Sequence, residues 1–182
     1  MPSPMVIIPR LEGMVSTVVE GGQTVAVWVE AVKSLLRSPQ YRDLTDLEFD
    51  FVPAITDVGI VVSASATHLI ADCWEISGDL GTDTGAYCGF TDADTDTIDI
   101  TVAMSTSEDV VTIFPVNDLA VSTVSEFYPH IYFAGSAGIE ATPGTYSETG
   151  IGLATGLTAW SDGKDGNATT AASCRAFVLY RT

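Results

Sequence analysis

The sequence predicts a mainly β protein, an antiparallel β-sandwich or jelly-roll-like domain preceded by an extended N-terminal arm and one amphipathic helix. From residue 47 onward, short runs of Val, Ile, Phe and Thr alternate with turns rich in Gly, Asp and Ser, which is typical of antiparallel sheets. Only residues 24–37 show helical periodicity, so no further helix is expected to cover a parallel sheet. We divide the chain into residues 1–45, for anchoring and oligomerisation, and residues 46–182, an acidic β domain.

The N-terminal residues are expected to form an extended arm followed by a strand. Pro2, Pro4 and Pro9 lie within the first ten residues, and proline removes a backbone donor and fixes its own φ angle. Residues 14–19 then predict a strand, which the Gly pair after Glu20 ends.

Residues 24–37 carry the strongest helical pattern in the chain. The apolar residues recur at i, i+3, i+4, i+7, i+10 and i+11, and they are Val25, Trp28, Val29, Val32, Leu35 and Leu36. Lys33 and Arg37 lie in the last turn, where cations offset the helix dipole, and Pro39 ends the helix. A strand over residues 24–29 is the alternative. We expect the apolar face of this helix to form an interface with another molecule.

The remainder of the chain predicts many short strands. The main candidates are residues 47–53, 59–64, 68–76, 86–90, 97–104, 110–116, 121–133 and 175–181. In the fifth of these, apolar and polar residues alternate without a break, which indicates a half-buried strand. Residues 134–173 are rich in Gly, Ser, Thr and Ala, and we expect three shorter strands near 145–147, 151–154 and 157–160.

The charge of the protein lies almost entirely in its second part. Residues 1–45 contain four cations and four anions, whereas residues 46–182 contain 20 Asp and Glu against three Lys and Arg, giving a net charge of −17. An acidic surface, with a pI near 4.1, excludes nucleic acid and anionic membranes as partners because both carry negative charge. The mean hydropathy of +0.29 is high, and no apolar run reaches the roughly 18 residues of a membrane helix. The surplus apolar surface therefore predicts a homo-oligomer.

The densest group of carboxylates is the main candidate metal site, and Asp162, Asp165 and Asn167 are a weaker candidate. Asp92, Asp94 and Asp96, with Asp99 nearby, could supply oxygen ligands to Ca²⁺. The EF-hand pattern fails, because Thr97 replaces the required Gly and the bidentate Glu is missing. A solvated acidic turn is the competing interpretation, and no other cofactor is predicted.

The histidines and cysteines predict no catalytic site. His68 and His130 lie in strand-like stretches, and no Gly-x-Ser-x-Gly elbow is present. Cys73, Cys88 and Cys174 are an odd, widely spaced set that indicates buried thiols, with a Cys73–Cys88 bridge as the alternative. A glycosidase with paired carboxylates is a further candidate, but no carboxylate stands out from the others. We therefore expect a protein that is not an enzyme.

Two aromatic residues are the candidates for ligand binding. Trp160 lies beside the polar turn at residues 161–167, and Tyr146 lies in the Gly- and Ser-rich segment before it. Exposed aromatic rings at the end of a β-sandwich are typical of sites that stack on sugars. An aromatic cluster around His130 alternates between the two faces of a strand, so part of it is expected in the core.

Taken together, the proline-containing arm, the amphipathic helix, the acidic β body and the excess of apolar residues resemble small structural proteins of tailed-phage virions. These include capsid cement or decoration proteins and small fibre or baseplate modules. The resemblance implies a cyclic homo-oligomer, with a trimer favoured, that bridges shell subunits and binds the major capsid protein or another virion protein. It also implies a location in the virion after assembly in the host cytoplasm, in keeping with the absence of a secretory signal. The alternative is a carbohydrate-binding or adhesin-like β module, assisted by Ca²⁺.

Overall fold

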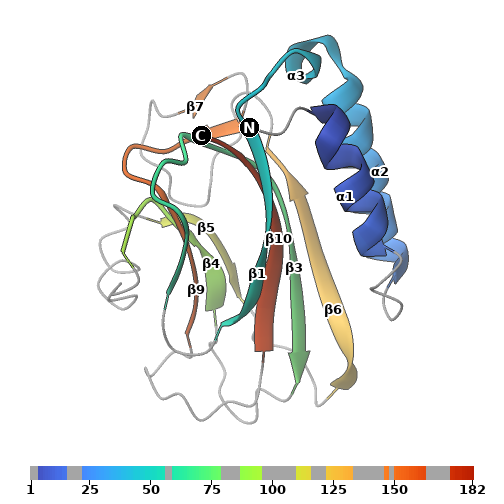
Figure 1. Cartoon of the computed structure of the whole chain (residues 1–182). Coiled ribbons are helices and arrows are strands. Elements are labelled where there is room, and N and C mark those ends of the chain that lie inside the picture. The colour runs from blue at the N-terminus through green and yellow to red at the C-terminus, as the bar shows by residue number, and fades with distance from the viewer. Residues whose placement is uncertain are drawn as a thin grey trace.

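The chain folds into three layers, in which two helices cover one sheet and a second sheet covers the opposite face of the first (Figure 1). The computed structural model describes residues 4–15, 22–55, 59–78, 87–95, 110–115, 122–132, 146–147, 150–162 and 173–182. The helices are α1 (Pro4–Val15), α2 (Gly22–Arg37) and the short α3 (Pro39–Arg42).

All strand pairs are antiparallel, and they form two sheets. Sheet A contains β1 (Leu47–Ile55), β3 (His68–Gly78), β6 (Ser122–Ile131), β7 (Tyr146–Ser147), β8 (Gly150–Gly152) and β10 (Ser173–Arg181). Sheet B contains β2 (Ile60–Ser63), β4 (Tyr87–Thr91), β5 (Val110–Pro115) and β9 (Leu157–Asp162). The order in sheet A is β1-β10-β3-β8-β7, with β6 also paired to β3, and the order in sheet B is β2-β9-β4-β5.

The predicted fold class, a mainly antiparallel β protein with two sheets, is confirmed. From residue 47 onward, each strand predicted within the described residues is present, with ends that differ by a few residues. The three short strands expected between residues 134 and 173 are β7, β8 and β9. The predicted strand at 97–104 lies outside the described residues. Of the two interpretations for residues 24–29, the helix is correct.

The predicted extended arm is wrong, because residues 4–15 form helix α1. Pro4 is the first residue of the helix, where the missing N–H has no intrahelical partner to lose. Pro9 lies inside the helix and costs about 3 kcal/mol relative to a good helix former. Ile7 and Leu11 are completely buried against α2 and sheet A, and this burial offsets the cost. The predicted strand at 14–19 is wrong at Met14 and Val15, which continue α1, and residues 16–19 lie outside the described residues.

Sheet A is buried on both faces, and its central strands show this most clearly. Along β10, Ala176 and Val178 face sheet B, whereas Phe177 and Leu179 face the helices. All four side chains are at most 3% exposed. The apolar surface on the helix side explains why α1 and α2 must lie there.

Trp28 is the residue that ties the helical layer to the edge of sheet A. Its side chain is 2% exposed, and its indole Nε1 donates a hydrogen bond to the backbone carbonyl of His130 on β6 at 3.2 Å. Its ring also lies beside that of Phe49 on β1, with centroids 6.4 Å apart. The Trp28 side chain thus contacts β1 and β6, which lie on opposite sides of the central strands of sheet A.

Replacing Trp28 with alanine should destabilise the protein by about 3–5 kcal/mol, because the change leaves a large cavity between α2 and sheet A. The free energy of unfolding in urea measures the effect. Val27→Ala is the matched control on the same helix, because Val27 is 69% exposed and should change the free energy by less than about 0.5 kcal/mol. Equal effects of the two substitutions would show that α2 is not docked through Trp28.

Candidate functional site

The most unusual buried group is Asp72 on β3, which is completely inaccessible to solvent. One of its carboxylate oxygens lies 3.0 Å from Nδ1 of His130, and the other accepts a hydrogen bond from the Tyr132 hydroxyl at 2.9 Å. The rings of His130 and Tyr132 are stacked, with centroids 6.2 Å apart. Asp72 thus binds two side chains from β6 and the residue that follows it, and it holds this edge strand against β3.

Burial raises the pKa of Asp72, because the charged carboxylate loses its hydration. Hydrogen bonds from His130, Tyr132 and Trp74 oppose this effect and lower the pKa in part. A carboxylate behind an imidazole is also the pair that orients a catalytic histidine. Here Asp72 is 0% and Tyr132 is 8% exposed, so these two side chains hold β6 against β3, whereas the His130 side chain is 34% exposed and remains accessible to solvent.

A second buried acid, Glu75, lies on the opposite face of β3. It is 3% exposed and accepts a hydrogen bond from Arg175 Nε on β10. The Arg175 guanidinium lies 5.8 Å from the ring centre of Phe51, and the Phe51 ring also packs against Phe177 at 5.1 Å. Phe51 remains 45% exposed. The ion pair therefore supports an exposed aromatic ring on the helix side of sheet A.

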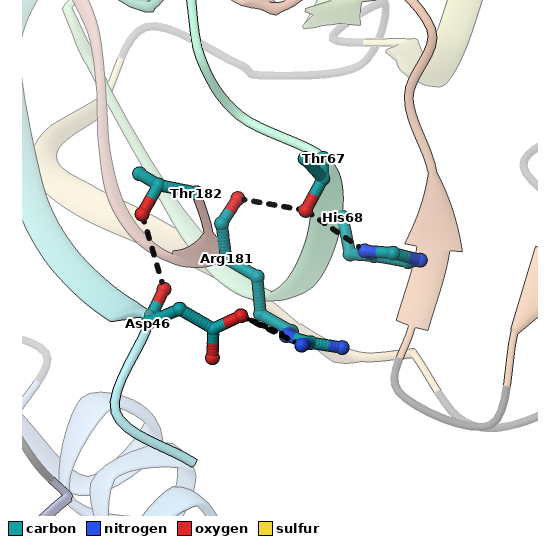
Figure 2. Close-up of polar contacts among 5 residues, drawn as sticks. All are labelled: Asp46, Thr67, His68, Arg181 and Thr182. Atoms are coloured by element: carbon teal, nitrogen blue, oxygen red, sulfur yellow. Dashed lines mark hydrogen bonds and ion pairs between the residues drawn. The ribbon is translucent and has the colours of Figure 1, made fainter.

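Figure 2 shows a third polar group, which closes the end of sheet A at the last residues of β10. Arg181 donates from Nε and Nη2 to one oxygen of Asp46, at 3.0 and 2.6 Å. The backbone carbonyl of Arg181 accepts from the amide of Thr67 at 2.8 Å, and the Thr67 hydroxyl lies 3.0 Å from His68 Nδ1. Burial, with the nearby Arg181 cation, lowers the pKa of His68. These contacts join β1, β3 and β10.

The predicted metal site shows a different arrangement. Both oxygens of Asp92 accept backbone N–H groups, from Ala154 and Thr155 at 2.7 Å each and from Gly156 at 3.1 Å. The carboxylate therefore fastens the connection between β8 and β9 to the end of β4. Asp94 is exposed, whereas Asp96 and Asp99 lie outside the described residues. Among the described residues, no group of three His, Cys, Asp or Glu side chains could hold a metal ion. A Ca²⁺ site here stays a prediction.

The apolar face of α2 was predicted to contact another molecule, and this must be corrected. Val25, Trp28, Val29, Val32 and Leu36 are at most 3% exposed, and Leu35 is partly buried. They pack against α1 and sheet A of the same chain. The reason is that sheet A also has an apolar face on this side, which the sequence pattern of the helix alone does not reveal.

Trp160 was expected to be exposed, and this expectation is wrong because its side chain is completely buried. It lies on β9 opposite Gly89 of β4. Its ring has no accessible face for a sugar in this structure. Tyr146 lies on β7, and its side chain is outside the described part. Cys73 and Cys174 are buried, as expected, and Cys73 contributes to the core between sheet A and the helices.

Exposed apolar residues mark one side of the molecule. Four large apolar side chains are exposed in the part of the chain that the structure describes: Val6, Val27, Phe51 and Val61. The first three lie on α1, on α2 and on the helix-facing side of β1, and only Val61 lies on sheet B. Sequence reasoning missed Val27, although its position on the polar face of an amphipathic helix was a usable signal.

Comparisons with known proteins do not assign the chain. No family model matches it, and no curated protein matches it. None of the described helices is long and apolar enough to cross a membrane. Any function must therefore be argued from the residues themselves.

The pKa of Asp72 predicts how stability depends on pH. Because the folded-state pKa lies above the unfolded value of about 4, the folded state favours the protonated carboxyl. The contribution of Asp72 to stability is therefore greatest below the unfolded pKa and decreases as the pH rises through the folded one. In Asp72→Asn this titration is absent, and the amide can still pair with His130 and Tyr132.

We expect the free energy of unfolding of the wild type, relative to that of Asp72→Asn, to fall as the pH rises from 4 to 8. Urea unfolding at several pH values measures both proteins under the same conditions. A wild-type advantage that grew towards neutral pH would contradict the prediction.

Asp92→Ala should destabilise the protein by about 1–3 kcal/mol, because three backbone N–H groups lose a charged acceptor. Asp94→Ala is the matched control, since Asp94 is exposed on the same turn, and a surface change costs less than about 0.5 kcal/mol. Thermal unfolding with Ca²⁺ and with EDTA, compared for both variants, also tests the metal site. An equal loss in the two variants would contradict the role given to Asp92.

Proposed function

We propose that this chain is a non-enzymatic structural protein of a virion, a cement or decoration protein that bridges and stabilises neighbouring subunits of a capsid shell. The observation that carries the proposal is that three of the four large apolar side chains exposed in the described residues belong to the helices or to the helix-facing side of β1. Val6, Val27 and Phe51 lie there. Residues 1–45, which include the three helices of the described part of the chain, contain equal numbers of cations and anions.

A neutral, partly apolar side is suited to protein contacts, because desolvation costs little and no net charge repels the partner. The acidic residues are concentrated in residues 46–182, which suits a surface that faces water and resists non-specific association. One molecule thus has a side suited to binding and a side suited to solvent.

The polar groups in the interior support a structural role. Asp72, Glu75, Asp92 and Arg181 each bind groups from neighbouring strands or connections. Bonds of this kind strengthen the fold. Cement function requires contact area and rigidity, and bonds of this kind favour rigidity.

The alternative, a carbohydrate-binding module, has less support. Its main candidate residue, Trp160, is completely buried. The remaining aromatic residues with partial exposure on one face of β6 are Tyr128 and His130.

The test is whether the full-length protein stabilises shells that were assembled without it. Purified shells from the phage that encodes the chain are heated with and without the protein, and the rupture temperature is followed by light scattering. A cement protein should raise the rupture temperature and sediment with the shells. If the protein stays in the supernatant and the rupture temperature does not change, the proposed function is wrong.

A further inference from the structure

The outer face of α2 carries a second pattern, distinct from the apolar face that packs on sheet A. Val27, Ala31 and Ser34 recur at i, i+4 and i+7, and all three are exposed. These residues lie on one stripe of the helix. Ala31 and Ser34 are small, so another helix could approach closely at this point.

Two residues of opposite charge lie along one edge of the stripe. Glu30 and Arg37 are both exposed and lie seven residues apart, on the same edge of α2. Glu30 also accepts a hydrogen bond from Lys33 at 2.8 Å, and Lys33 contacts Glu12 of α1 at 2.9 Å. Glu30 is thus held at the side of the stripe by a cation that has a second partner.

We propose that two copies of this chain associate through the outer faces of their α2 helices, antiparallel about a twofold axis near residues 31–34. In this register Ala31 of each copy lies beside Ser34 of the other. Glu30 of each copy lies near Arg37 of the other, and Val27 packs near the partner's Ser38. The pairing is self-complementary, as a twofold interface requires. The inference rests on the proposed function and divides the helix side: the outer face of α2, with Val27, contacts a second copy, and Val6 and Phe51 are left for the shell. It also takes a pair in place of the expected trimer.

The charge distribution selects this face over the others. Each copy carries a net charge of −17, and residues 46–182 hold 20 of the 24 acidic residues. A helix with its side chains is about 10 Å across, so two helical layers separate the β layers by about 20 Å. That distance exceeds the Debye length of about 8 Å at physiological ionic strength. Contact through the helices therefore avoids most of the repulsion that contact between the β layers would create.

Strand pairing at the edge of sheet A is the main competing way for two copies to meet. Within the described residues β1 pairs with β10 alone. Its register with β10 shifts after Val52, and Pro53 removes a backbone donor. In an antiparallel pairing of two β1 strands centred on Phe49, Glu48 would also lie opposite Asp50. The β1 edge is therefore unsuited to self-pairing.

The contact is expected to be moderate in strength. Helix α2 contains 16 residues, which gives a length of about 24 Å. A pair of helices of this length buries less than the roughly 1,600 Å² of a standard interface. The association should accordingly be reversible and depend on protein concentration.

A cysteine at the predicted crossing point tests the register in the full-length protein. Under mild oxidation Ser34→Cys should form a covalent dimer on a non-reducing gel, and Val61→Cys should not, because Val61 lies on sheet B, away from the axis. Absence of the Ser34 dimer, or equal amounts of dimer from both variants, would overturn the inference.

Charge reversal tests the Glu30–Arg37 pairing. Glu30→Arg and Arg37→Glu should each weaken self-association by about tenfold, because a twofold axis replaces two attractions with two repulsions. The double variant Glu30→Arg/Arg37→Glu should restore the affinity, which a merely structural effect on the monomer would not do. Light scattering over a range of concentrations measures the mass, and circular dichroism checks that each variant is folded.

A wild-type mass that stays monomeric at all concentrations, or that corresponds to a trimer, would overturn the twofold pairing. Neither result would affect the shell test, so the failure of this inference and the failure of the proposed function are distinguishable.

Discussion

The structure depends on one constraint, which is that sheet A is apolar on both of its faces. The central strands β3 and β10 place side chains alternately towards sheet B and towards the helices, and both sets are buried. A sheet of this kind cannot expose either face to water at acceptable cost. Sheet B covers one face, and α1 and α2 cover the other, so the three layers follow from the side chains of two strands (Figure 1).

Polar groups that are buried or partly buried in this arrangement hold the edges and ends of the sheets. Asp72 binds β6, Asp92 binds the connection between β8 and β9, and Asp46 with Arg181 closes the end of sheet A. Each is satisfied by several partners, as buried polar groups require. Because these groups stabilise the fold, a partner is expected to contact surface residues. The helix side differs most from the rest of the surface in its charge balance and its exposed apolar side chains.

The layering also separates charge from apolar surface. Residues 1–45, which include the described helices, carry no net charge, and Val6 and Val27 are exposed there. Most of the acidic residues belong to the part of the chain that forms the sheets. Such a molecule is expected to associate through its helices, since this contact keeps the acidic layers of the two molecules apart. Shell binding and self-pairing are both proposed on this basis.

The sequence by itself determined the antiparallel strands, the position of α2 and the separation of charge along the chain. These features depend on local periodicity and on composition, which need no knowledge of the neighbours in space. Only the tertiary structure decided that residues 4–15 are helical, because the burial of Ile7 and Leu11 outweighs the local preference of Pro9. It also decided that the apolar face of α2 packs within the chain and that Trp160 is buried, since side chains distant in sequence cover them. Local patterns show which residues avoid water, but the packing of the whole chain decides what covers them.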